Sequence, residues 1–156
     1  MAYLFNDDKS KKYIDNDNSK WVKLTDIDGN NFFGTNAYFL GKIYYKKVGS
    51  SVTLKFNLDI FDDDVPANTM VNLIRLSDMP DDIKFEVDSK NSTSYLKSSP
   101  ILTIFDDKDI SLTKPLKRCV VFFSKDYLRL IILDKLNYLE GDGYSFNFMS
   151  EWTYNL

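Results

Sequence analysis

The sequence predicts an all-β protein, an antiparallel β-sandwich or jelly roll in one domain with a short N-terminal arm. The clearest observation is the stretch 52–60, in which apolar and polar side chains alternate without a break. A period of two places the apolar side chains on one face of a strand, whereas a helix would leave them without a continuous apolar stripe. Further short apolar or alternating segments recur roughly every 10 to 15 residues, with turn-forming residues and no helical period between them.

Length and composition fit one folded domain. The chain has 156 residues, of which 44% are apolar and 15% aromatic. A chain of this size buries most of a single core without disulfides or metal, and this apolar content argues against intrinsic disorder. We expect residues 20–156 to form the β domain and residues 1–19 to form an arm.

The arm begins with a short apolar tip and continues as a polar spacer rich in Asp, Asn, Ser and Lys. One interpretation is a frayed terminus. The other is that Tyr3, Leu4 and Phe5 dock on a neighbouring subunit or a larger assembly, because they have nothing local to bury against. Both interpretations stay open at the level of sequence.

Regular structure is expected to start with a short strand at residues 20–24, which the large side chain of Trp21 anchors. A turn signal follows at residues 28–31. A strand pair then spans residues 43–61 and is hinged at 48–50. Turn signals and prolines separate the later strands. Those strands are expected at residues 70–76, 101–105, 119–123, 127–133 and 144–149, with a last extended segment at 152–154. Residues 124–126 are the predicted turn of a hairpin.

Charge and targeting signals exclude several classes of protein. The formal net charge is −3 and the basic residues are dispersed among acids, so nucleic acid is not expected as a partner. The N-terminus lacks the basic and long apolar regions of a secretion signal, and the longest apolar run, residues 128–133, is too short to span a bilayer. Cys119 lies in an apolar run without a second cysteine, which predicts a buried core residue.

Catalytic signatures are missing from the sequence. The chain has no histidine, which removes Ser-His-Asp and Cys-His nucleophile systems and the usual zinc sites. It also has no phosphate-binding glycine loop, and the acidic clusters at 62–64, 81–82 and 106–109 do not have the spacing of an EF-hand. We therefore expect no catalytic residue, no metal and no cofactor, and a protein that is not an enzyme.

The remaining candidates for binding are aromatic residues with polar neighbours near the C-terminus. An aromatic ring can stack on a sugar while carboxylates and amides pair with the sugar hydroxyls. The alternative is that these rings belong to the core, as alternation indicates for Tyr144. The saccharide-binding candidates are Trp152, Tyr138, Tyr154, Asp142 and Glu151.

The order of these signals resembles the C-terminal head domains of tailed-phage receptor-binding proteins, found in tail fibres and baseplate tips. The resemblance covers roughly residues 20–156 and is a pattern of spacing and residue class. It rests on Trp21-Val22-Lys23-Leu24, residues 44–54, Leu76-Ser77-Asp78-Met79-Pro80, residues 121–130, Gly143-Tyr144-Ser145-Phe146 and Trp152-Thr153-Tyr154. The chain departs from the family pattern at residues 79–83 and in the hairpin turn, which has Lys125-Asp126 where glycine is usual.

This resemblance implies a non-catalytic β-sandwich head in the virion, at the tail tip or baseplate, assembled as a homotrimer. Its ligand would be a host cell-surface saccharide, a cell-wall polysaccharide. Residues 1–19 would dock on other tail or baseplate proteins. An alternative from a different functional class is a structural baseplate or tail decoration subunit that makes only protein–protein contacts.

Overall fold

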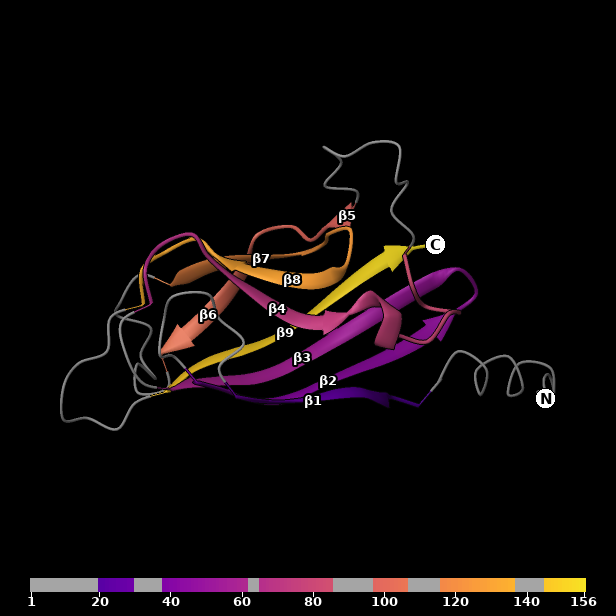
Figure 1. Ribbon diagram of the computed structural model, residues 1–156, viewed down its shortest axis with the longest axis horizontal. Helices are drawn as coiled ribbons and strands as arrows, with labels where there is room; N and C mark the ends of the chain where they lie inside the picture. Colours follow the sequence, from indigo (N-terminus) through magenta and orange to yellow (C-terminus); the bar gives the residue numbers. More distant parts are fainter. Residues whose placement is uncertain (1–19, 30–37, 62–64, 86–96, 107–115, 137–144) are drawn as a thin grey trace, which may run out of the picture.

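The computed structural model describes residues 20–29, 38–61, 65–85, 97–106, 116–136 and 145–156. The predicted arm, with Tyr3, Leu4 and Phe5, lies outside these residues. In the described part of the chain the elements are antiparallel strands and one 3-10 turn, which confirms the all-β prediction (Figure 1). No helix among the described residues is long and apolar enough to cross a membrane.

Within the described residues, nine strands form one continuous antiparallel sheet in the order β1-β2-β3-β9-β6-β7-β8-β4, with β5 paired to β7 off this path. In chain order they are β1 (Val22–Gly29), β2 (Tyr38–Val48), β3 (Ser51–Phe61), β4 (Thr69–Arg75), β5 (Lys97–Ser98), β6 (Leu102–Asp106), β7 (Lys117–Phe123), β8 (Tyr127–Ile132) and β9 (Ser145–Asn155), with the 3-10 turn η2 (Leu76–Asp78) after β4. The sheet is nearly closed into a barrel, and β1 and β4 are its end strands.

Strand β6 divides the sheet into two facing layers. Its residues 102–104 pair with β7, whereas Phe105 and Asp106 pair with β9. The chain thus leaves one layer and enters the other within a single short strand, as corner strands of folded-over sheets do. We call β1, β2, β3 and β9 the β3 layer, and β4, β8 and β7 the β8 layer; Figure 1 shows β7 and β8 along one side of the molecule and β1 and β2 along the other.

The long β2–β3 hairpin forms where the sequence predicts a hinge. Val48 pairs with Ser51, so the loop consists of Gly49 and Ser50. Gly49 has φ +60° and Ser50 has a negative φ, which is the pattern of a type II′ turn with glycine at its first central position. This turn matches the right-handed twist of the strands and sets the register in which Leu54, Phe56 and Leu58 all point inward.

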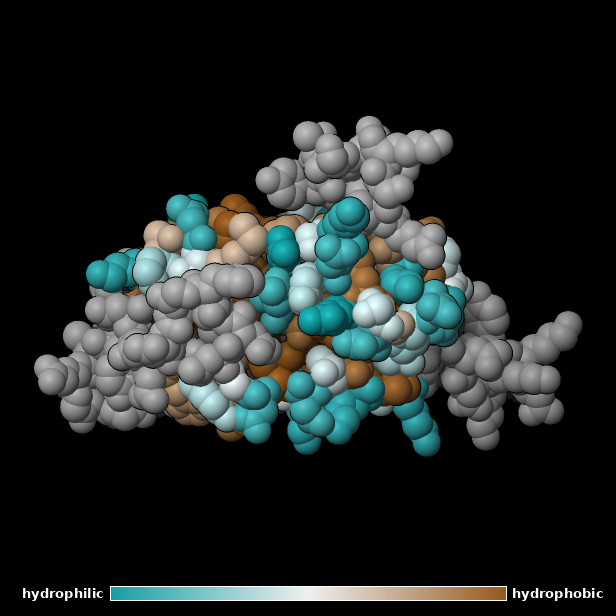
Figure 2. Space-filling view, in the orientation of Figure 1, coloured by the Kyte–Doolittle hydropathy of each residue, from teal (hydrophilic) through white to brown (hydrophobic). Residues whose placement is uncertain are grey.

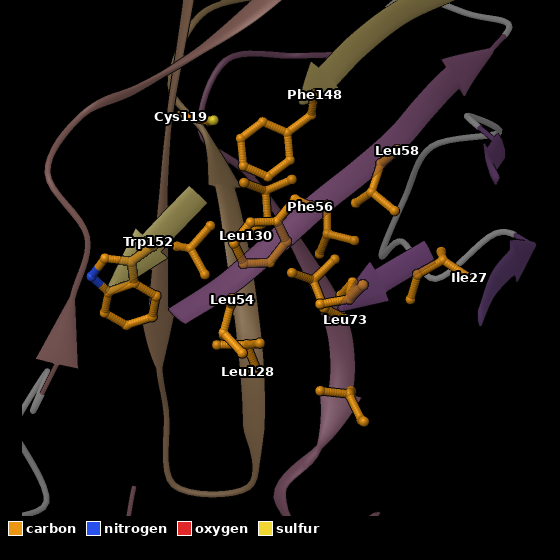
Figure 3. Close-up of a cluster of buried hydrophobic side chains, with 14 of the residues drawn as sticks. Ile27, Leu54, Phe56, Leu58, Leu73, Cys119, Leu128, Leu130, Phe148 and Trp152 are labelled. Carbon is orange, nitrogen blue, oxygen red and sulfur yellow. The ribbon is translucent and has the colours of Figure 1, made fainter. Parts of the chain in front are cut away.

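The core lies between the two layers and is built from their inner faces. Alternation along β3 sends Val52, Leu54, Phe56, Leu58 and Ile60 inward, all at most 2% exposed. Figure 3 shows that side chains from β3 and β9 meet those of β8 and β4 in the space between the layers. Each Leu, Ile or Phe that is fully buried here contributes about 1.5–3 kcal/mol relative to an exposed position.

Strand β4 has a bulge that adds one more side chain to this core. The register shifts between Asn72 and Ile74, so that Leu73 and Ile74 are both buried. A bulge inserts an extra residue opposite the partner strand and turns the following side chains over. Because of it, Arg75 points outward while Ile74, its neighbour, packs in the core.

Candidate functional site

Two of the predicted saccharide-binding residues lie in the aromatic core. Trp152 is 5% exposed and Tyr154 is 3% exposed. Both rings pack against Phe123, with centroid distances of 5.6 Å and 5.0 Å. The Tyr154 hydroxyl donates a 2.6 Å hydrogen bond to the Ile83 carbonyl, and burial raises the pKa of this hydroxyl.

These contacts correct the prediction for Trp152 and Tyr154. A ring that is at most 5% exposed offers no surface on which a sugar can stack, so the two residues have the core role that the sequence left as the alternative. Tyr138 and Asp142 lie outside the described residues. Glu151 is exposed and points outward from β9, where it contributes to a different surface.

That surface is the outer face of the β3 layer. Side chains alternate along each strand, so the residues that do not face the core form rows across β1, β2, β3 and β9. One row contains Tyr44, Lys55 and Glu151, and the next contains Lys42, Asn57 and Met149. In these rows β2, β3 and β9 bring residues more than 100 positions apart in sequence into one surface.

Trp21 lies against this face at the start of β1. The Nζ atoms of Lys46 and Lys55 lie 4.8 Å and 5.2 Å from the centre of its ring. Attraction between each ammonium group and the ring is worth roughly 0.5–1 kcal/mol at an exposed site. The indole therefore holds both lysines near one point and remains partly exposed itself.

A shallow open depression adjoins the lysines on β3 and β9. Its volume is about 410 Å³, and it is lined by Lys55, Phe56, Asn57, Met149, Ser150 and Glu151. Phe56 and Ser150 are the inward-facing pair between the two outer rows, so the depression lies in the gap between those rows. The resulting rim carries an ammonium group, an amide, a thioether and a carboxylate.

The polar groups of this rim are available to a ligand. Lys55 and Glu151 are direct cross-strand neighbours, yet Lys55 turns toward Trp21 and no ion pair forms between them. No carboxylate of the described residues lies within ion-pair distance of Lys46 or Lys55. Asn57 is exposed as well. The hydrogen-bond donors and acceptors around the depression therefore do not pair with one another.

A bulge in β1 shapes one border of this face. The register shifts between Lys23 and Thr25, so Lys23 and Asp26 project from the same side although residues three apart on a regular strand do not. Their side chains form a 2.9 Å ion pair. The hydrogen bond between them raises the pKa of Lys23 and lowers the pKa of Asp26. The two charges at this border therefore cancel. No carboxylate of the described residues does the same for Lys46 and Lys55 beside Trp21.

No family model, no curated protein and no solved structure matches this chain. Within the described residues there is no group of three or more acidic or cysteine side chains placed to hold a metal ion. The outer face of the β3 layer offers an aromatic ring, hydrogen-bond donors and acceptors, and an open depression, which are suited to binding a polar ligand.

The sequence pointed to only one member of this surface, Glu151. It identified Trp21 as an anchor and placed Lys55 and Asn57 on the polar side of a strand, but gave no partner strand for them. The pairing of β3 with β9 joins the middle of the chain to its end. Since register between distant strands is set by the whole sheet, this neighbourhood could not be found by local pattern.

Proposed function

We propose that this protein binds a saccharide, without chemistry, on the outer face of the β3 layer. The observation that carries this proposal is the partly exposed Trp21 ring beside Lys46, Lys55 and the depression that Glu151 borders. Sugars present C–H edges that suit an aromatic face and hydroxyls that need both donors and acceptors. This surface supplies both within one open site.

The wider biological setting that we propose follows from the sequence resemblance. In that setting the protein is a phage tail or baseplate head, present in the virion as a homotrimer, and its ligand is a host cell-wall polysaccharide. A shallow site suits a long polymer, because an open depression admits a chain that continues in both directions. The aromatic and polar residues named above support this proposal, and Trp152 and Tyr154 have no part in it.

The proposal is tested by measuring binding of the full-length protein to a panel of extracted bacterial cell-wall polysaccharides. We expect saturable binding to at least one of them and about a tenfold loss of affinity in Trp21→Ala, since an aromatic contact is worth roughly 0.5–1.5 kcal/mol. Glu151→Gln should also weaken binding. Trp21→Phe should keep most of it, because a ring remains.

Tyr38→Ala is the matched control, because it removes an exposed aromatic side chain at the far end of the same face. It should leave affinity unchanged. Unfolding by denaturant shows whether each variant is folded. Absence of binding to every polysaccharide, or equal loss in Trp21→Ala and Tyr38→Ala, would contradict the proposed site. Release of reducing ends from a bound polysaccharide would contradict the absence of chemistry.

A second candidate function is a structural subunit that makes only protein contacts. It is favoured by the outer face of the β8 layer, where Met70 and Ile101 are 41% and 60% exposed. Failure of the saccharide screen together with assembly through that face would support it. The two functions use opposite sides of the molecule, so variants of one face leave the other intact.

A further inference from the structure

We infer that the outer face of the β8 layer binds the N-terminal segment of a second copy of this chain. In this contact Tyr3 and Phe5 cover an apolar strip, and Asp7 meets two arginines beside it. The inference does not depend on saccharide binding. It assigns an occupant to a surface that the proposed function leaves unused.

The apolar strip runs across three strands. Met70 on β4 pairs with Ile131 on β8, and Ile131 pairs with Val120 on β7. Ile101 comes beside Val120, since the residue after it, Leu102, pairs with Cys119. Met70 and Ile101 at the two ends are the most exposed members. In Figure 2 hydrophobic residues break the hydrophilic surface along the upper rim, where Figure 1 places β7 and β8.

An arginine pair lies next to the strip. The guanidinium groups of Arg75 and Arg129 lie 5.7 Å and 5.5 Å from the centre of the Tyr127 ring. Arg129 also donates from Nε to the Asn72 side chain, at 2.9 Å. No carboxylate of the described residues pairs with either guanidinium, although the whole chain has a net charge of −3. Two neighbouring guanidinium groups that no described carboxylate neutralises are suited to receiving carboxylates.

The composition of this face differs from that of the β3 layer and resembles a protein interface. Interfaces are enriched in Tyr, Met and Arg and depleted in Lys and Glu. The outward positions of β4 and β8 hold Met70, Asn72, Arg75, Tyr127, Arg129 and Ile131, with no lysine or glutamate among them. All three arginines of the chain lie on this layer: Arg75, Arg118 and Arg129. Arg118 forms an ion pair with Asp134.

Electrostatic repulsion disfavours a dimer in which two copies pair directly through the outer faces of their β8 layers. A symmetric dimer through this face would bring Arg75 and Arg129 of one copy toward the same residues of the other, and like charges would oppose it. The partner must instead present carboxylates beside apolar side chains. The first eight residues of the chain do so, with Tyr3, Leu4 and Phe5 followed by Asp7 and Asp8.

The spacing of the segment matches the face. In an extended chain Phe5 and Asp7 project to the same side, about 7 Å apart. Ile131 and Arg129 on β8 are also two residues apart on one face of a strand, and thus have the same separation. Phe5 can therefore lie on the strip while Asp7 reaches the arginine pair.

The position of Trp21 favours a second copy over the same copy. Its ring lies on the outer face of the β3 layer, on the opposite side of the molecule from the strip. A segment from the same copy would have to wrap around the sheet to reach the arginines. Exchange between copies avoids this and gives a head-to-tail contact, which either closes into a ring or continues into a chain.

Sedimentation of the full-length protein over a wide range of concentration tests the contact. We expect mass above that of a monomer at high concentration. Arg75→Glu combined with Arg129→Glu should weaken association at least tenfold, and so should Asp7→Lys combined with Asp8→Lys. Mixing the two double variants should restore association, because each then supplies the charge that the other's face or segment requires.

Lys42→Glu combined with Lys46→Glu is the matched control, because it makes the same change of charge as the arginine double variant, on the outer face of the β3 layer. It should leave association unchanged. A monomer at every concentration would overturn the inference, including the case in which the segment binds its own copy. Association that survives either double variant, or mixed variants that do not associate, would overturn it as well. Circular dichroism and the unfolding midpoint establish that each variant is folded.

Discussion

Single residues in this protein show how burial changes the meaning of a sequence pattern. Trp152 and Tyr154 are aromatic residues of the type that stacks on sugars, but both pack on Phe123 in the core. Trp21 precedes the first strand and looks like an anchor, yet it keeps an exposed ring beside two lysines. Exposure of the ring, which local sequence does not determine, separates a binding residue from a core residue.

The Tyr154 hydroxyl provides a prediction at this scale. Tyr154→Phe removes the donor to the Ile83 carbonyl and leaves that buried oxygen unpaired. We expect the free energy of unfolding to fall by roughly 1–2 kcal/mol. Denaturant unfolding measures it, and an unchanged m-value would show that the core stays closed. A variant as stable as the parent would mean that the hydrogen bond contributes nothing net.

At the scale of elements, one carboxylate ties the start of β7 to the end of β8. Asp134 accepts 2.9 Å and 2.8 Å hydrogen bonds from Nε and Nη2 of Arg118, and another from its backbone N–H. Leu133 N–H also donates to the Arg118 carbonyl, at 2.9 Å. The pairing with Arg118 lowers the pKa of Asp134 to about 2.

This pKa predicts a dependence of stability on pH. A carboxyl whose pKa is lower in the folded state stabilises the fold above its ordinary pKa of about 4, and this stabilisation is lost as pH falls toward the folded value. We expect Asp134→Asn to cost about 1 kcal/mol at neutral pH, since the pair is partly solvated, and little at pH near 2. Unfolding curves of both proteins across this range would show a constant difference if Asp134 were unimportant.

The strands and hairpins could largely be predicted from the sequence, whereas the residues at which the strands begin and end could not. Hairpins at residues 48–50 and 124–126 and the strands around them follow from alternation and turn residues. β2, however, begins at Tyr38, five residues before the start of the strand pair that the sequence predicts at residues 43–61. Gly41 is needed there because a Cβ would collide with the Asn57 carbonyl of β3, and such an approach is visible only when the strands are paired.

At the scale of the whole molecule, β6 makes two layers share one core. Cys119, on β7 in the middle of the strand order, is fully buried in it. Burial raises the pKa of its thiol to about 12, so that at pH 8 the group is neutral as well as enclosed. Access to this thiol therefore requires the layers to separate.

We expect Cys119 to react with a thiol reagent only through unfolding. The native protein should be unreactive at pH 8, and the reaction should become fast over the same range of denaturant in which circular dichroism reports loss of the sheet. Absorbance of the released thiolate of the reagent measures the rate. Rapid reaction without denaturant would show that the layers open locally and that the core is not one cooperative unit.

The class of the fold, the turn between β2 and β3, the buried cysteine and the absence of histidine can all be read from the sequence. Each of these follows from the identity of residues or from a period of two, which are local properties. Three features appear only in the folded molecule: which rings are exposed, the pairing of β3 with β9, and the gathering of the arginines on one layer. These depend on strand order and register, because side chains distant in sequence become neighbours only when the sheet closes on its core.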